Sequence, residues 1–122
     1  MTTITRQEIE DSCAILYRHF GAFECGDGWL PMIHKLSLRL EQIITEEMKT
    51  ATEDQELPYI LQIKEKFGGL RFYISSGTDQ MIKLIDKAEE DSFDICENCG
   101  STDNVKTEGK GWIKTLCNGC TK

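Results

Sequence analysis

Apolar residues recur at helical spacing in three stretches of this chain, and a residue that can cap a helix precedes each stretch. The spacing predicts helices over residues 5–20, 27–50 and 79–93. Thr5 is the expected N-cap of the first helix, and Glu8 stands three residues later, in the position of a capping box. Two predicted helices therefore precede the main strand pattern of the chain, and one follows it.

The second and third helices have start signals of their own. Asp27 lies between two glycines and is the expected N-cap of the second helix. Pro31 follows in the first turn, where its missing N–H group is harmless. Thr78 is the expected N-cap of the third helix.

One part of the chain alternates between apolar and polar residues, which is the pattern of a strand with one buried face. Alternation covers residues 59–67 and resumes over residues 70–75. Gly68 and Gly69 lie between them and predict a two-residue hairpin turn. One face of the hairpin would be apolar except at Glu65, which could pair with a buried cation. The apolar residues expected on that face are Tyr59, Leu61, Ile63, Phe67, Leu70, Phe72 and Ile74.

The other face of the predicted hairpin collects three cations and an aromatic ring. A turn at the two glycines would place Lys66 opposite Arg71 and Lys64 opposite Tyr73. Like charges opposite each other destabilise a sheet, so this face is interpreted as a site for a phosphate, a nucleotide or a carboxylate cluster on a partner. The alternative is that acidic residues of the third helix neutralise the face. Those residues are Asp79, Asp86, Glu89, Glu90 and Asp91.

Four cysteines near the C-terminus form two Cys-x-x-Cys pairs, Cys96 with Cys99 and Cys117 with Cys120. Two such pairs about 15–20 residues apart are typical of zinc ligands, because each turn presents two thiolates to a common centre. Two turns complete a tetrahedron, and four thiolates leave no coordination position for water. The sequence therefore predicts a structural Zn²⁺ ion.

Two further cysteines, Cys13 and Cys25, lie outside these pairs. An apolar leader sequence is lacking, so the chain is expected to be cytoplasmic, where thiols stay reduced. Cys13 lies on the apolar face of the first predicted helix and is interpreted as a core residue. Cys25 precedes a helix N-terminus, which would lower its pKa, and a nucleophilic Cys25 with His34 as its base is an alternative.

Length and composition favour one α+β domain with a small appendage. The chain has 122 residues, 39% hydrophobic and 29% charged, so its core is modest and a metal would help to stabilise it. The expected division is a body over residues 1–93, with three helices and a two-stranded β-hairpin, and a C-terminal zinc ribbon over residues 94–122. No stretch approaches the roughly 18 apolar residues that span a bilayer, so no membrane association is expected.

Five short motifs are spread along the chain. They are Cys25-Gly-Asp-Gly-Trp29, the segment from Ile63 to Tyr73, Ala88-Glu89-x-x-Ser92, the Cys-x-x-Cys-Gly motif at Cys96, and Gly111-Trp-Ile-Lys-Thr-Leu-Cys117. As a set they resemble a family of short zinc-ribbon-containing proteins of tailed phages and bacteria. The resemblance covers most of the chain between residues 24 and 120. It implies a phage or prophage setting and a zinc ribbon, and it implies no activity.

The formal charge of −7 disfavours binding to the phosphates of nucleic acid. The favoured function is a non-catalytic interaction protein that binds a protein partner, such as a host or defence protein. One alternative is a binder of a small phosphorylated ligand or nucleotide through the cationic hairpin face. Another is a nucleic-acid-binding ribbon, in which Trp112 stacks on a base beside Lys106, Lys110, Lys114 and Lys122. An enzyme is less favoured, with Asp27, His34 and Glu65 as its loose catalytic candidates.

Overall fold

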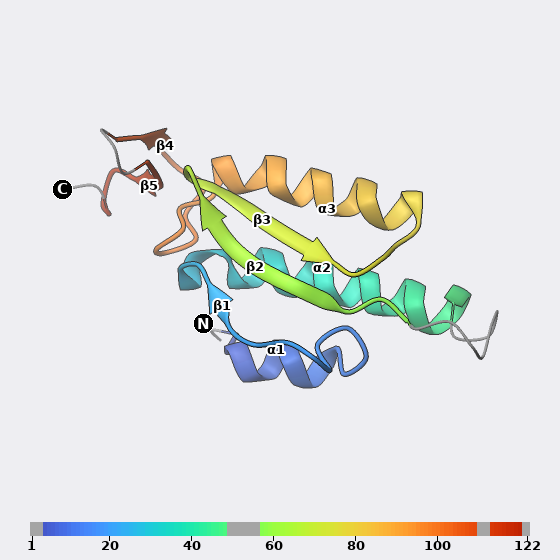
Figure 1. Ribbon diagram of the computed structural model, residues 1–122. Coiled ribbons are helices and arrows are strands. Elements are labelled where there is room, and N and C mark those ends of the chain that lie inside the picture. Colours follow the sequence, from blue (N-terminus) through green and yellow to red (C-terminus); the bar gives the residue numbers. More distant parts are fainter. Residues whose placement is uncertain (1–3, 49–56, 110–112, 121–122) are drawn as a thin grey trace.

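The chain folds as an α+β protein, with three helices on one side of a small sheet (Figure 1). The computed structural model describes residues 4–48, 57–109 and 113–120 of the chain. The helices are α1 (Arg6–Ser12), α2 (Leu30–Ile43) and α3 (Asp79–Asp91). The main sheet contains β1 (Phe23–Glu24), β2 (Ile60–Lys66) and β3 (Gly69–Ile74). A separate two-stranded sheet pairs β4 (Val105–Glu108) with β5 (Lys114–Cys117) at one end of the molecule.

The first helix starts where the sequence predicts but ends eight residues early. The capping box is confirmed: the Glu8 amide donates to Thr5 Oγ1 at 3.1 Å, and the Thr5 amide donates to the Glu8 carboxylate at 3.2 Å. The predicted continuation to residue 20 is wrong, because α1 ends at Ser12 and turns follow. The amides of Ile15 and Leu16 donate to the Glu41 carboxylate of α2 at 3.0 and 2.9 Å. The Glu41 carboxylate thus accepts the hydrogen bonds that backbone carbonyl groups one turn earlier would accept in a continuing helix.

The second helix starts later than expected. Asp27 begins a 3-10 turn, Asp27–Trp29, and does not cap α2, which starts at Leu30 with Pro31 in its first turn. The Asp27 carboxylate instead accepts from the Arg6 guanidinium at 2.7 Å. A π-helical turn, Ile44–Met48, follows α2, and the predicted end at residue 50 lies outside the described residues. For α3, the predicted N-cap Thr78 is confirmed: its hydroxyl accepts from the Met81 amide.

The hairpin turn lies one residue earlier than predicted. Lys66 pairs with Gly69, so the two turn residues are Phe67 and Gly68, with φ of 53° and 86°. Positive φ at both positions matches the twist of the flanking strands. The predicted register is therefore wrong: Arg71 lies opposite Lys64 and not opposite Lys66.

The shifted turn and a β-bulge also change which side chains are buried. Phe67 was expected on the apolar face but lies in the turn and is 64% exposed. Leu61 was expected there too, but the register shifts between Ile60 and Gln62, and Leu61 is 59% exposed. Ile63 and Phe72, which pair across the two strands, are buried as predicted.

The sheet has three strands, and not the two that the sequence predicts. β1 pairs in parallel with β2, placing Phe23 beside Ile63 and Glu24 beside Lys64. A strand of two residues is too short to show alternation, so its sequence carries no pattern to detect. Its pairing brings the loop that starts at Cys25 to the end of the sheet where the hairpin turns (Figure 1).

Side chains cover the backbone at both edges of this sheet. On β3, the amides of Leu70 and Phe72 donate to Ser92 Oγ and to the Glu89 carboxylate, both at 2.9 Å. At β1, the Arg6 guanidinium donates to the carbonyl oxygen of Phe23 at 3.2 Å and to that of Cys25, the residue after the strand, at 3.0 Å. A partner therefore meets side chains, and not free backbone groups, at these positions.

Candidate metal centre and sheet face

The four cysteines of the two pairs converge at one point. Their Sγ atoms all lie within 4.8 Å of one another, and those of Cys99 and Cys117 are 3.6 Å apart. Zinc bound tetrahedrally by thiolates at about 2.3 Å requires sulfur atoms about 3.8 Å apart, so a small contraction would complete such a site. The cluster of Cys96, Cys99, Cys117 and Cys120 can therefore hold a metal ion.

Local backbone geometry presents these thiols to the centre. Cys96 follows a 3-10 turn at the end of α3, and Cys117 ends β5. The Gly100 amide donates to the Cys96 carbonyl at 2.9 Å and closes the first turn under the sulfur atoms. Gly100 has φ of 83°, a left-handed conformation that favours glycine. The Cys120 amide closes the second turn on the Cys117 carbonyl at 3.1 Å.

Hydrogen bonds favour a thiolate inside this cluster. Burial raises the pKa of Cys96, but backbone N–H groups of Cys117, Cys99 and Asn98 outweigh it and lower that pKa to about 6. A backbone hydrogen bond lowers the pKa of Cys99, yet the surrounding thiols raise it to about 12. Cys96 is thus prepared to carry negative charge, whereas Cys99 keeps its proton. A metal ion would displace the proton of a bound thiol.

The cysteine module, defined here as residues 94–109 and 113–120, lies against the body through the loop before α2. The Gly28 amide donates to the Glu97 carbonyl at 2.7 Å, and the Gly26 amide donates to the Glu97 carboxylate at 2.8 Å. Trp29 Nε1 donates to the Ile95 carbonyl at 2.9 Å, with the indole fully buried. The Cys25-to-Trp29 segment, which the sequence indicated as a helix start, is therefore also the surface that holds the first cysteine pair.

The hairpin turn makes the second contact with the cysteine module. Thr115 Oγ1 donates to the Gly68 carbonyl at 2.6 Å, in a buried position. Thr115 has one hydroxyl hydrogen, so Thr107 Oγ1, also 2.6 Å away, donates to Thr115. Gly68 and the next residue, Gly69, are both tightly packed. A Cβ on Gly68 would lie 2.7 Å from the Thr107 side chain, and a Cβ on Gly69 would lie 2.5 Å from the Phe93 ring.

A charged network links the same three segments. Lys114 Nζ lies 3.3 Å from the Glu65 carboxylate and 3.5 Å from that of Glu97. Glu65 also accepts from the Gly68 amide at 2.7 Å, and Glu97 is 6% exposed. Glu65 therefore pairs with a cation as predicted, but that cation, Lys114, is partly exposed and not buried. Lys114 is neutralised by two carboxylates, which weakens the case for a basic, nucleic-acid-binding ribbon.

Changing Thr115 to valine is expected to destabilise the fold by about 1–3 kcal/mol, because the Gly68 carbonyl would stay buried without its donor. Thr102→Val is the matched control, since Thr102 is exposed on the same module. Urea unfolding of both variants measures the difference. Equal midpoints for the two variants would show that this contact does not hold the module.

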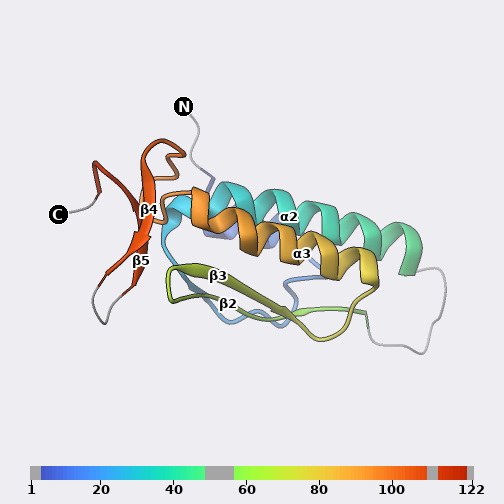
Figure 2. The same cartoon turned by 90° about the horizontal axis from the view of Figure 1, so that it is seen from above.

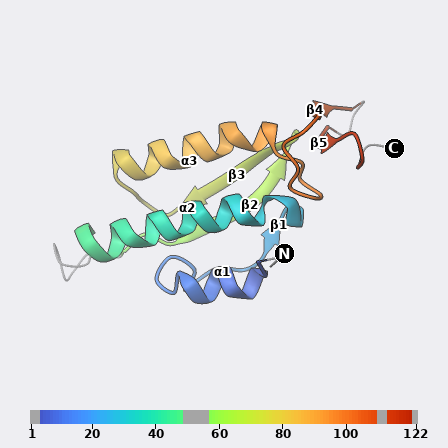
Figure 3. The same cartoon turned by 180° about the vertical axis from the view of Figure 1, so that it is seen from behind.

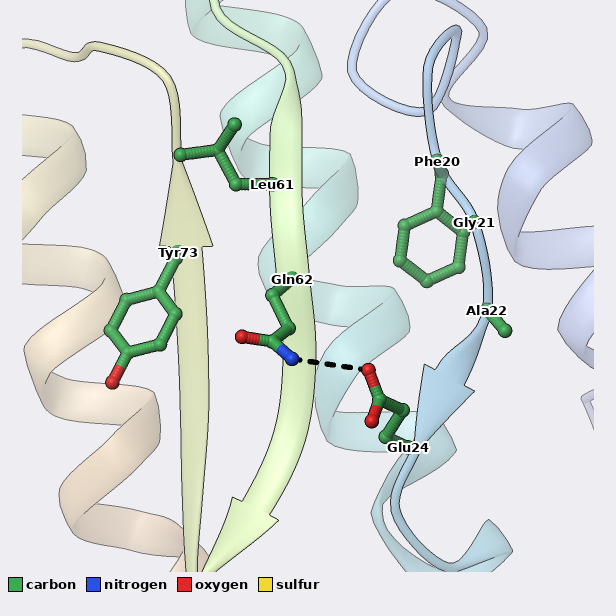
Figure 4. A pocket seen from close by; sticks show the side chains of 7 residues that line it. All are labelled: Phe20, Gly21, Ala22, Glu24, Leu61, Gln62 and Tyr73. Carbon is green, nitrogen blue, oxygen red and sulfur yellow. Dashed lines mark hydrogen bonds between the residues drawn. The ribbon is translucent and has the colours of Figure 1, made fainter.

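The outer face of the sheet, turned away from the helices, gathers the residues of the predicted binding site. Arg71 lies directly opposite Lys64, and Lys66 and Tyr73 lie on the same face. Tyr73 is 43% exposed and Leu61 lies nearby (Figure 4). Within the described part of the chain, no carboxylate forms an ion pair with these three cations. Arg71 Nε is buried and lacks a hydrogen-bond partner there.

The predicted neutralisation of this face by α3 is not found among the described residues. The Glu89 carboxylate accepts from a β3 amide, and Asp91 pairs with Lys87 at 2.7 Å. The acid that does lie on the face is Glu24 of β1, beside Lys64, and it accepts from the Gln62 amide at 3.1 Å. The sheet face therefore keeps an excess of positive charge.

A hollow of about 350 Å³ lies on this face (Figure 4). Its walls come from β1 and the chain before it and from both strands of the hairpin. The lining residues are Phe20, Gly21, Ala22, Glu24, Leu61, Gln62 and Tyr73. Glu24 is the charged residue of the lining, and the cations stand outside it. The hollow therefore suits an uncharged side chain better than a phosphate group.

The two remaining cysteines have no features of a nucleophile. Cys13 is fully buried, as predicted, and burial raises its pKa to about 12. Burial also raises the pKa of Cys25 to about 12, so the expected lowering by a helix N-terminus is wrong. Both thiols are protonated at neutral pH. His34 Nε2 is buried, without a hydrogen-bond partner among the described residues.

Comparison of the chain with models of known protein families, with characterised proteins and with solved structures finds no match. These comparisons do not bear on the resemblance to phage and bacterial zinc-ribbon proteins. In the described ranges, no helix is both long and apolar enough to cross a bilayer.

Proposed function

We propose that this protein is a non-catalytic interaction module that binds an acidic patch on a partner protein through the outer face of its sheet. The carrying observation is the juxtaposition on that face of Lys64, Lys66 and Arg71 with the exposed side chains of Leu61 and Tyr73. The three cations lack an ion pair within the described residues. Arg and Tyr are the residue types that most often dominate binding energy when a partner buries them.

The proposal includes a structural zinc ion at the cysteine cluster. Thiolate ligands in two Cys-x-x-Cys turns favour zinc, and a closed set of four leaves no site for a reacting water molecule. The metal would hold the cysteine module against the hairpin turn, and the turn in turn fixes the strands that carry the cations. The resemblance to phage proteins makes a bacterial host protein the first partner to seek.

A protein partner is favoured over the two alternatives. A small phosphorylated ligand would need a pocket with cations inside it, whereas the nearby hollow is lined by Glu24. Duplex nucleic acid carries about one negative charge per 1.7 Å, so a chain with a net charge of −7 repels it more strongly than it repels a single acidic patch on a protein. An acidic protein surface can bring apolar groups for Leu61 and Tyr73 together with carboxylates for the cations.

Changing Arg71 to alanine is expected to leave stability within about 0.5 kcal/mol of the parent, or to raise it slightly, because repulsion from Lys64 is relieved. Affinity for the partner should fall by about 1–3 kcal/mol through loss of charge-assisted hydrogen bonds. Thermal melts measure the first effect. Quantitative mass spectrometry of bacterial proteins captured on the parent and the variant measures the second.

Lys106→Ala is the matched control, because it removes one exposed cation from the cysteine module and not from the sheet face. Clear destabilisation by Arg71→Ala with unchanged capture would contradict the proposal. Titration with a fluorescent single-stranded oligonucleotide provides a second arm. Tight, salt-sensitive binding of the oligonucleotide that depends on Arg71 would show that the sheet face binds nucleic acid and not an acidic protein.

A further inference from the structure

A second open surface lies between α2 and α3, on the helix side of the molecule. The two helices run side by side (Figures 2 and 3), and a groove of about 860 Å³ follows them. Its apolar lining includes Met32, Leu36 and Leu38 of α2 and Leu84 and Ala88 of α3. Leu38 lies in the middle of α2, and its apolar side chain is 43% exposed.

The groove has the dimensions of a helix-binding site. Its lining on α2 extends from Pro31 to Gln42, a rise of about 17 Å at 1.5 Å per residue. That length corresponds to about three turns of a bound helix. Two parallel ridges with an apolar floor are the geometry into which an amphipathic helix fits its apolar stripe.

The charges at the rim specify the kind of helix. Lys35 and Arg39 stand one turn apart on α2, and Lys87 faces them from α3. Lys87 already forms an ion pair with Asp91 at 2.7 Å. Arg39 donates a hydrogen bond to the side-chain amide oxygen of Gln42, a neutral group, at 3.0 Å. Neither Lys35 nor Arg39 forms an ion pair with any residue that the structure describes. In a chain with 21 acidic and 14 basic residues, this rim is locally positive.

We infer that the groove between α2 and α3 binds an amphipathic helix of a partner protein, about three to four turns long, with acidic residues beside its apolar stripe. The apolar stripe covers Met32, Leu38 and Leu84. Carboxylates on its flank meet Lys35 and Arg39. The surface is separate from the sheet face, so a helix bound in the groove leaves the cations of that face accessible.

The test uses the full chain to select binders from a displayed library of peptides about 14 residues long, which is just under four helical turns. The apolar stripe is fixed, and the flanking positions vary among Glu, Lys and Ser. Enriched peptides are expected to carry Glu at the flanks. A synthetic copy of the most enriched peptide should bind Leu38→Glu and Arg39→Glu at least tenfold more weakly than the parent. Lys83→Glu, an exposed charge reversal on α3 outside the groove, should leave binding unchanged.

Three outcomes would overturn the inference. The first is enrichment of Lys-flanked or Ser-flanked peptides, or of none. The second is binding that survives Leu38→Glu but is lost in Arg71→Ala, which would assign the peptide to the sheet face. The third is a dimer of the chain alone, seen by sedimentation and dissociated by Leu38→Glu, which would make a second copy the occupant. Circular dichroism of each variant confirms that the helices are retained.

Discussion

Replacing Cys117 by serine is expected to prevent the cluster from holding the proposed zinc ion and to lower the melting temperature of the whole chain. The cluster would keep three thiols, and the affinity of the site for zinc would fall. A ligand that binds the folded state contributes about 4 kcal/mol when its free concentration is a thousand times its Kd, and the variant would lose a contribution of that order. The body should be affected as well, because Glu97 and Thr115 of the cysteine module bond to its loops.

The measurement combines metal analysis of natively purified protein with thermal melts in the presence and absence of a chelator. The parent is expected to hold about one zinc ion per chain. Cys25→Ser is the matched control, since Cys25 lies outside the cluster, and it should retain its metal. Well under half an equivalent of metal in the parent would refute the zinc site. Full retention of metal by Cys117→Ser would refute its assignment as a ligand.

The second large effect is expected from Gly28→Ala, which tests how closely the body contacts the cysteine module. A Cβ at residue 28 would lie 2.2 Å from the Cys96 carbonyl oxygen and 2.5 Å from that of Glu97. Both atoms belong to backbone that the cysteine cluster holds in place, so no flexible side chain can yield. We expect a loss of about 3 kcal/mol or more, the upper range for an overpacked site.

Gly21→Ala provides the control for this change. Nothing lies within 4 Å of a Cβ built at residue 21, so its effect should stay within about 0.5 kcal/mol. Urea unfolding followed by tryptophan fluorescence reports on both variants, because Trp29 is buried beside the contact. If the two variants unfold at the same midpoint, the loop does not hold the cysteine module as described.

The features that were predicted correctly are those that a few neighbouring residues decide. The caps at Thr5 and Thr78 need only an amide three residues further along the chain. The cysteine cluster likewise follows from its spacing, because each Cys-x-x-Cys turn presents its own thiols. By contrast, the early end of α1 depends on Glu41, more than twenty residues away, which accepts the amides that a longer helix would have used.

The hairpin register failed for a different reason. Two adjacent glycines suggested that both belong to the turn, yet only Gly68 does. Gly69 lies against the Phe93 ring instead, and a side chain at residue 69 would force that ring to move. A glycine that serves an approaching surface cannot be distinguished from a turn glycine by sequence alone. The resulting error placed the wrong lysine opposite Arg71, although the set of cations on the face was correct.

The covered edges of the sheet have a consequence for behaviour at high concentration. Extended chains polymerise by adding strands to free backbone groups at a sheet edge. Here Ser92 and Glu89 accept from amides of β3, and Arg6 donates to one carbonyl of β1 and to the carbonyl of the residue that follows it. The native sheet is thereby a poor template for fibril growth or for strand exchange between copies. Exposed Leu61 and Tyr73 can thus remain open to a partner with little risk of aggregation through the strands that carry them.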